Sequence, residues 1–341
     1  MKMARAEITP TLEKPAVISL FCGAGGLDLG FKQEGYAIPL AIDSDRSAIE
    51  THCFNFQDTS AVIADLTAIG PTGVQNYALA SIPIGSRIGI IGGPPCQGFS
   101  RGNISSDPDD PRNLLPALYI EIISKLQETY TVEFVVFENV MGMKDKKHEE
   151  KYSQLISGLS SLSFDVTEKE LCAADFGVPQ NRYRVIVTAV RSGQRYSSVT
   201  PIKNNARVTV RDAIGHLSEP AFYRRKISPS DIPLHPNHWT MQPKSPKFLE
   251  KNFNNSMSRS FRKLSWEKPS PTIAFGNREI HVHPNGHRRL SIFEAMLLQG
   301  FPIDFELKGN LSQQVQQVSN AVPPPLARSL AKAITISMNL I

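Results

Sequence analysis

The sequence has 341 residues, of which 41% are hydrophobic and 20% charged, a composition ordinary for a soluble globular protein and long enough for two domains. No apolar run is long enough for a signal peptide or a membrane span, so we expect a cytoplasmic protein of bacterial type, without a membrane partner. The four cysteines are too few and too scattered for a disulfide framework, and no Cys-x-x-Cys pair offers a metal site.

The net charge of +5 is unevenly distributed along the chain. Residues 191–289 hold 18 Lys and Arg against 6 Asp and Glu, a balance of +12, whereas the other residues hold 19 against 26, a balance of −7. Because Lys and Arg neutralise phosphates, this segregation predicts a polyanion-binding module within an acidic-to-neutral body. A solvated basic surface is the alternative that charge alone leaves open.

The first half alternates short apolar runs with helix-length segments. The runs at 17–21, 37–42, 61–64, 88–91 and 134–137 are typical of buried strands, and their rhythm predicts a doubly wound, largely parallel sheet. Two further runs, 166–172 and 183–190, are expected to close the sheet as a hairpin. From Arg191 the periodicity fades, which indicates a domain boundary, and the next long helix is expected at about 291–298.

Glycines and acids follow the first three expected strands. Phe21-Cys22-Gly23-Ala24-Gly25-Gly26 follows the first, and its glycines allow a tight turn whose backbone approaches a ligand closely. Asp43 ends the second strand, where an acid of a βαβ unit holds a ribose diol, and Asp65 ends the third. This series favours a nucleoside ligand, although a helix N-cap remains the structural alternative for Asp43.

A cysteine follows the fourth expected strand in the stretch Gly92-Gly93-Pro94-Pro95-Cys96-Gln97-Gly98-Phe99-Ser100. The prolines cannot continue the strand, so Cys96 is presented at its carboxyl end, where open α/β sheets build their sites. A lone cysteine is usually an inert buried residue. Partner groups at later strand ends favour a nucleophile instead.

Those partners are a glutamate and two arginines. A very apolar strand delivers Glu138, whose burial is expected to favour the protonated form and so a role as an acid; a capping or ion-paired glutamate is the alternative. Arg182 and Arg184 are two residues apart, so they point to one face if the segment is extended. Such a pair can hold a phosphate or an electron-rich ring oxygen.

Together these motifs, in this order, resemble the cytosine-5 DNA methyltransferases. The matching blocks are residues 19–26, Asp43, Asp65, Pro95-Cys96-Gln97, Glu138-Asn139-Val140, the Gln-x-Arg-x-Arg of residues 180–184, and two late blocks at 289–302 and 317–324. Departures are mild: Ser19 stands where Asp is common, and Asp43 where Glu is common.

The resemblance implies an α/β fold, with a Rossmann-like S-adenosylmethionine-dependent methyltransferase domain formed by residues 1–190 and 315–341. A smaller, irregular and basic target-recognition domain with a hinge would be inserted at 191–314. The last helix, expected from about residue 324 to 338, would then pack back on the catalytic domain.

The resemblance also implies roles for single residues. Cys96 would add to carbon-6 of a flipped-out cytosine, Glu138 would hydrogen-bond or protonate ring nitrogen 3, Arg182 would bind the carbonyl oxygen and Arg184 would order the site. S-adenosyl-L-methionine, which becomes S-adenosyl-L-homocysteine, would be held by Phe21, Gly23, Ala24, Gly25, Gly26, Asp43, Ser44, Asp65, Leu66, Pro94, Leu114, Asn320 and Val322. DNA contacts would come from Gln97, Ser100 and Arg101 on a closing loop at 94–110, and from Arg224, Arg225, Lys226, Arg259 and Arg262.

Other functions share some of these features. A dinucleotide oxidoreductase shares the sheet and the glycine turn but does not explain Pro95-Cys96, Glu138 and Arg182 together. An RNA cytosine-5 methyltransferase and a catalytically silent DNA-binding homologue stay open. The family implies a monomer that acts on double-stranded DNA as the modification enzyme of a restriction–modification system, with a cognate endonuclease acting independently on the same site.

Overall fold

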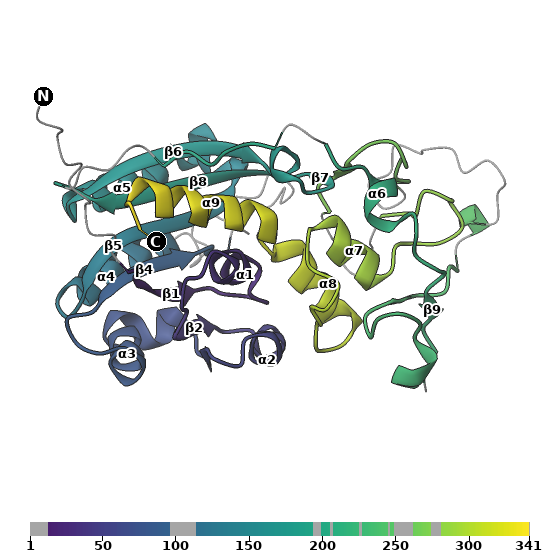
Figure 1. The fold of residues 1–341 in the computed structure, drawn as a ribbon, viewed down its shortest axis with the longest axis horizontal. Helices are drawn as coiled ribbons and strands as arrows, with labels where there is room; N and C mark the ends of the chain where they lie inside the picture. Colours follow the sequence, from purple (N-terminus) through teal and green to yellow (C-terminus); the bar gives the residue numbers. More distant parts are fainter. Residues whose placement is uncertain are drawn as a thin grey trace, which may run out of the picture.

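The centre of the molecule is a seven-stranded sheet (Figure 1). The computed structural model describes residues 13–95, 114–193, 199–204, 207–224, 227–244, 246–248, 262–273 and 281–340. Its strands are β1 (Ala16–Leu20), β2 (Leu40–Asp43), β3 (Ser60–Ile63), β4 (Arg87–Gly92), β5 (Thr131–Val140), β6 (Phe164–Cys172) and β8 (Tyr183–Arg191), in the order β3-β2-β1-β4-β5-β8-β6. The first five are parallel, and β8 runs antiparallel to both β5 and β6. The predicted parallel sheet with a closing hairpin is confirmed.

Helices cover both faces of this sheet because its central strands, β1, β4 and β5, are apolar on both faces. On one face, Ile18 and Leu20 of β1 pack with α3 (Leu66–Ser81), α4 (Leu115–Gln127) and α5 (Glu149–Ser161). On the other face, Val17 and Ile91 pack with α1 (Gly26–Gln33) and α9 (Pro324–Ser337). A further helix, α2 (Arg46–Asn55), packs through Ile49 on Ala41 of β2. These layers are the doubly wound arrangement that the sequence predicts.

The last helix of the chain returns to the first helix, as expected. Figure 1 shows α9 lying across the sheet beside α1. The two helices approach so closely that a side chain at Gly30 of α1 would collide with Ala327 of α9. The carboxyl end is therefore part of the body that holds the glycine turn before α1.

Beyond the sheet lies a second lobe with few regular elements. It contains α6 (Val210–Ile214), β9 (Ala221–Phe222), β10 (Trp239–Thr240), β11 (Ser270–Pro271), α7 (Ile292–Leu298) and α8 (Leu311–Asn320), together with the 3₁₀ turns η5 (Pro229–Asp231) and η6 (Pro246–Phe248). Strand β9 pairs with β10, and β11 pairs with β7 (Gln180–Asn181), which follows the 3₁₀ turn η4 (Ala173–Phe176). Two more 3₁₀ turns, η2 (Met141–Lys144) and η3 (Lys146–His148), follow β5. The expected helix at 291–298 is confirmed as α7.

Helix α8 was not expected from the sequence, and it joins the two lobes. Its Val315 and Val318 belong to an apolar cluster with Met296 of α7, and the same cluster takes in Ala24 and Phe56 from the sheet lobe. The expected boundary between residues 314 and 315 falls inside this helix. Because a helix is one rigid element, a boundary at this end of the insert lies outside α8 rather than at residue 314.

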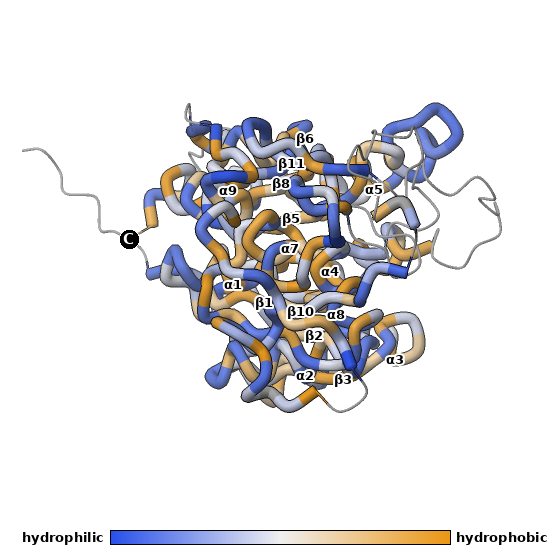
Figure 2. The backbone as a smooth tube through the Cα atoms, turned by 90° about the vertical axis from the view of Figure 1, so that its right-hand side faces the viewer, coloured by the Kyte–Doolittle hydropathy of each residue, from blue (hydrophilic) through white to orange (hydrophobic). Residues whose placement is uncertain are grey.

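Hydrophobic segments run through the interior of the molecule, and hydrophilic ones are more frequent toward its outside, in the view of Figure 2. Within the described ranges, no helix combines the length and apolarity needed to cross a bilayer.

Candidate active site

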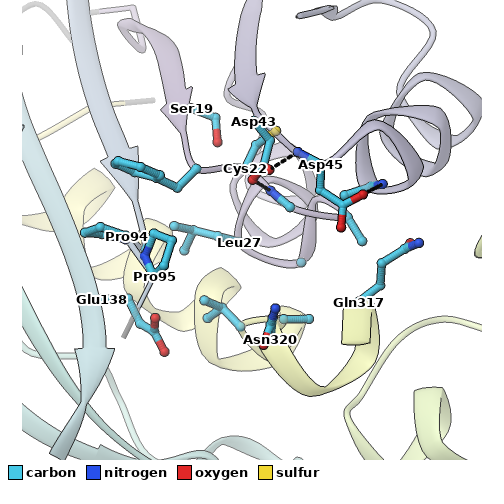
Figure 3. Close-up of a pocket in the computed structure, with 18 of the residues that line it drawn as sticks. Ser19, Cys22, Leu27, Asp43, Asp45, Pro94, Pro95, Glu138, Gln317 and Asn320 are labelled. Atoms are coloured by element: carbon cyan, nitrogen blue, oxygen red, sulfur yellow. Dashed lines mark hydrogen bonds between the residues drawn. The ribbon is translucent and has the colours of Figure 1, made fainter. Parts of the chain in front are cut away.

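A cavity opens where β1, β2, β4 and β5 end, and α8 closes its other side (Figure 3). Twelve of the seventeen predicted catalytic and cofactor-binding residues line it: Phe21, Gly23, Ala24, Gly26, Asp43, Ser44, Pro94, Glu138, Arg182, Arg184, Asn320 and Val322. They come from distant parts of the chain, which the parallel sheet brings together because the carboxyl ends of its parallel strands share one edge. The cavity is therefore at the location that the sequence predicts.

The glycine turn forms the cavity wall between β1 and α1. Gly23 and Gly25 have φ angles of 53° and 88°, in the left-handed region where glycine is unstrained, and Phe21 also has a positive φ of 53°. At Gly26 a side chain would collide with the carbonyl oxygen of Val322. This turn therefore requires glycine both for its conformation and for close packing against the chain that follows α8.

Asp43 is the acid that organises this turn. Its Oδ2 accepts a hydrogen bond from the Gly23 amide at 2.8 Å, and its Oδ1 accepts one from the Asp45 amide at 2.8 Å. Burial raises the pKa of the Asp43 carboxyl, and the two amide hydrogen bonds oppose that rise. Asp45, rather than Asp43, is the N-cap of α2, so the structural alternative for Asp43 does not hold.

On β5, Glu138 faces the cavity and is paired with an arginine. Arg184 Nε lies 2.8 Å from Glu138 Oε1, and the glutamate is 7% exposed. An added side chain at Gly93 would come within 3.0 Å of Glu138 Oε2, so the glycine leaves room for the carboxylate. The ion-paired alternative for Glu138 thus holds, with the partner inside the same cavity.

Arg182 and Arg184 both line the cavity, as their spacing predicts. Arg182 is 1% exposed, and its Nη2 donates to the carbonyl oxygen of Ser319 on α8 at 2.8 Å. Helix α8 therefore holds the Arg182 guanidinium through Ser319. Asn320, the residue after Ser319, lines the cavity.

Four predicted cofactor residues lie elsewhere. Asp65 is an exposed N-cap of α3 that accepts hydrogen bonds from Thr67, and Leu66 is buried in the core beneath α3. Leu114 borders a separate groove between α4 and α5. Gly25 does not line the cavity, since its α-carbon packs against the Phe56 ring. An acid that follows a strand can also cap the next helix, as Asp65 does for α3.

Several predicted residues lie outside the described part of the chain: Cys96, Gln97, Ser100, Arg101, Arg225, Lys226 and Arg259, together with the expected loop beyond Pro95. The chain is described up to Pro95, which lines the cavity and is exposed. Arg224 and Arg262 are described and exposed, and Arg224 pairs with Asp231 at 2.7 Å.

Sequence reasoning missed a polar group beneath the glycine turn, formed by Ser19, Asp28 and His52. It also assigned no role to Cys22, whose thiol lines the cavity and whose pKa is raised well above its usual value, first by burial and then by Asp28 and Asp43. No group of three potential metal ligands occurs among the residues that the structure describes.

The sheet order and the polar cavity at its carboxyl edge define a Rossmann-like α/β fold, with the cavity where such sheets build their sites. A sequence profile of the C-5 cytosine-specific DNA methylase family matches residues 16–335. The Type II methyltransferase M.MthTI of Methanothermobacter thermautotrophicus is 30% identical, with 93% of this chain and 96% of that protein covered. The Type II methyltransferase M1.HphI of Haemophilus parahaemolyticus is 32% identical, with coverages of 94% and 87%.

A solved structure shows the same fold. A prophage-encoded DNA modification methyltransferase from E. coli superposes with a TM-score of 0.78 at 24% identity, covering 96% of this chain and all of that one. Since the profile spans nearly the whole sequence, the chain belongs to the C-5 cytosine-specific DNA methylase family and is a DNA (cytosine-5-)-methyltransferase.

Proposed function

We propose that this enzyme transfers a methyl group from S-adenosylmethionine to carbon-5 of a flipped-out cytosine in one short duplex DNA sequence. The observation that carries the proposal is the convergence of Asp43, Glu138 and Arg182 in one cavity, at the edge where Pro95 leads into Cys96. Asp43 would bind a nucleoside, and Glu138 and Arg182 would polarise a pyrimidine ring. All three thus share one cavity with Pro95, the residue that precedes the proposed nucleophile.

The residues present fit the cofactor. The positive-φ turn at Gly23 offers backbone at close approach, and Asp43 stands beside it at the end of β2, where it would bind the ribose hydroxyls. Phe21 would lie against the adenine ring, and Asn320 and Val322 line the cavity from the other side. Bound S-adenosylmethionine supplies an electrophilic methyl group on a sulfonium.

The chain's own residues would activate the base. Carbon-5 of cytosine is a poor nucleophile, so the Cys96 thiolate first forms a bond to carbon-6 and the ring electrons shift toward carbon-5. Glu138 would protonate or hydrogen-bond nitrogen 3, and Arg182 would stabilise charge on the carbonyl oxygen. Arg184, paired with Glu138, would hold that carboxylate in place.

Release of the product would follow from the same adduct. After carbon-5 accepts the methyl group, a base removes the carbon-5 proton, and the electrons of that C–H bond restore the ring double bond. As that double bond forms, the bond between carbon-6 and the Cys96 sulfur breaks and its electron pair returns to the sulfur as the thiolate, while a proton that nitrogen 3 took from Glu138 returns to that carboxylate. No net oxidation or reduction occurs.

The proposal includes the DNA partner and the division of labour between the lobes. Carbon-6 is not accessible in a stacked duplex, so the cytosine would be flipped out at a cost of a few kcal/mol. The basic stretch 191–289, with its balance of +12, would bind the phosphates and read the sequence. Residues 1–190 and the carboxyl end would form the catalytic domain, with the inserted segment ending before Leu311 of α8. The relatives named as Type II methyltransferases support a role as the modification enzyme of a restriction–modification system.

The test is nucleoside mass spectrometry of methylation-free genomic DNA, and of RNA from the same host, after incubation with the purified chain and S-adenosylmethionine. We expect 5-methyl-2′-deoxycytidine in DNA, none in RNA, and none in DNA with Cys96→Ala. A methyl group on the exocyclic amine of cytosine would contradict the carbon-5 chemistry. Methylation of RNA alone would contradict the substrate.

A further inference from the structure

A buried carboxylate lies under the glycine turn without a cationic side-chain partner. Asp28, in the first turn of α1, is fully buried, and its Oδ1 accepts a hydrogen bond from the Ser19 hydroxyl at 2.7 Å. Its Oδ2 lies 2.8 Å from His52 Nε2 on α2. Among the described residues, no lysine or arginine forms an ion pair with it.

His52 offers the Asp28 carboxylate one hydrogen bond. The bond to Asp28 places one imidazole proton on Nε2, whereas Nδ1 is buried and has no hydrogen-bond partner. A second proton on Nδ1 would be a buried donor without an acceptor, which is costly. The geometry therefore gives His52 a partner for one ring proton only, and the Asp28 carboxylate has no lysine or arginine against it among the described residues.

The Asp28 carboxylate belongs to the wall of the cavity. Both Ser19 and Asp28 line it, and Figure 3 shows Ser19 above Leu27, between the Pro94 side of the cavity and Cys22. Its field reaches the neighbouring wall, because Asp28 contributes, after burial, to the raised pKa of the Cys22 thiol. An isolated charge away from water interacts strongly with any cation that enters.

Ser19 and Pro94 lie at the ends of neighbouring strands, since Ser19 pairs with Ile91 in the register of β1 and β4. Ser19 also pairs with Ala41 in the register of β1 and β2, the strand that ends at Asp43, so Ser19 lies between the Asp43 side and the Pro94 side of the cavity. A donor whose ribose is held at Asp43 and whose methyl group points toward a base near Glu138 would carry its sulfonium across this middle position. The Asp28 carboxylate would thus lie near the charged end of the donor.

We propose that Asp28, oriented by Ser19 and His52, is a specificity-determining residue that makes the cavity prefer the cationic sulfonium cofactor over its neutral thioether product. The inference rests on the proposed function and deepens it. The preference follows from charge, since S-adenosylmethionine and S-adenosylhomocysteine differ by one methyl group and one positive charge. Loss of that charge on methyl transfer would weaken binding and favour product release.

The test compares dissociation constants of the full chain for both ligands by calorimetry. Asp28→Asn keeps the shape and removes the charge, so the ratio of the S-adenosylhomocysteine constant to the S-adenosylmethionine constant is expected to fall about tenfold or more. Affinity for 5′-methylthioadenosine, which lacks the amino-acid end, is expected to stay within about twofold. A merely structural role would weaken all three ligands alike and leave the ratio unchanged.

Two further variants separate charge from architecture. Glu133→Gln removes another buried carboxylate, paired with Arg87 near the other end of β5, and is expected to keep the ratio. A double variant, Ser19→Asp with Asp28→Ser, moves the carboxylate to the other end of the same hydrogen bond. It is also expected to keep the ratio of the two dissociation constants. If Asp28→Asn does not fold, the double variant provides the test. A ratio of dissociation constants equal to that of the wild type supports the proposal, and a ratio that falls about tenfold overturns it.

The outcomes also separate this inference from the proposed function. If the wild-type chain binds neither ligand, the cofactor assignment fails and this inference fails with it. If it binds both and Asp28→Asn leaves their ratio unchanged, only the role of Asp28 is overturned.

Discussion

At the scale of single residues, Asp43 couples the end of β2 to the glycine turn. Asp43→Asn replaces one accepting oxygen by an N–H₂ group that faces an amide donor, Gly23 or Asp45. We expect stability to fall by about 1–3 kcal/mol, because a buried amide loses its acceptor, and cofactor affinity to fall about tenfold or more. Urea unfolding and calorimetric titration check both values, with the exposed Asp58→Asn as the control. Unchanged affinity would contradict the role of Asp43.

His283 provides a pH prediction at the same scale. Burial lowers the pKa of His283 from 6.5 to about 4, although Glu294 acts in the opposite direction. Between these values the unfolded chain binds more protons than the folded one, so stability falls as pH falls. From about pH 7 to pH 4.5 the contribution is about 2 kcal/mol.

His283→Asn keeps an oxygen that can accept from the Asn285 amide, as the imidazole Nδ1 does. Between pH 7 and pH 4.5, the free energy of unfolding of the His283→Asn variant is expected to fall by about 2 kcal/mol less than that of the wild type. Chemical unfolding at both pH values measures this, with exposed His216→Asn as the matched control. Parallel pH profiles of all three proteins would show that His283 is not the group responsible.

At the scale of elements, a buried pair of glutamines ties β7 to α7 and to the end of α8. Gln180 Nε2 donates to Gln299 Oε1 at 2.6 Å, and Gln299 Nε2 donates to the carbonyl oxygen of Ala321 at 2.7 Å. Both side chains are fully buried. Gln299→Leu therefore removes the acceptor of one Gln180 N–H, so that Nε2 keeps only the longer bond to the Leu298 carbonyl oxygen at 3.3 Å. It also removes the donor to the Ala321 carbonyl oxygen, and we expect a loss of about 3 kcal/mol.

Equilibrium unfolding in urea tests this, with Gln316→Leu on the exposed side of α8 as the control, expected to stay within about 0.5 kcal/mol of wild type. Equal effects of the two substitutions would show that the buried pair does not stabilise this junction.

The sequence predicted the elements whose own residues carry a strong pattern. The runs that form β1, β2, β4 and β5 are apolar on both faces and bounded by turn residues, so they stand out locally. Helix α8 was missed because its stretch is rich in glutamine and serine, and its apolar Val315 and Val318 gain meaning only against α7.

In the site as well, residues within a local sequence pattern could be predicted, and residues that meet only in the folded chain could not. The positions of Asp43, Glu138 and Arg182 at the cavity could be predicted because each follows an apolar run or belongs to a recognisable motif. The group Ser19, Asp28 and His52 was missed because its members come from three elements and form one unit only in three dimensions. Asp65 caps α3 and lies outside the cavity, and the sequence could not distinguish this position from that of a ligand-binding acid, because both follow a strand.

At the scale of the whole molecule, the segregation of charge predicts that DNA is bound through the basic stretch 191–289. The basic stretch belongs to the second lobe, and the remainder carries a balance of −7. Each neutralised phosphate contributes about −0.9 to the slope of log affinity against log salt concentration. We expect a slope of about −4 or steeper for duplex DNA between about 50 and 200 mM salt, measured by fluorescence anisotropy. A slope near zero would contradict binding through this basic stretch.

The central claim is that the chain methylates carbon-5 of cytosine through Cys96. The most direct measurement is base-resolution mapping of 5-methylcytosine in DNA from a methylation-free host that expresses this chain, with Cys96→Ala as the control. The account predicts methylation confined to one short sequence in the first host and none in the second. Methylation that persists with Cys96→Ala, or its absence with folded, cofactor-binding wild-type protein, would contradict it.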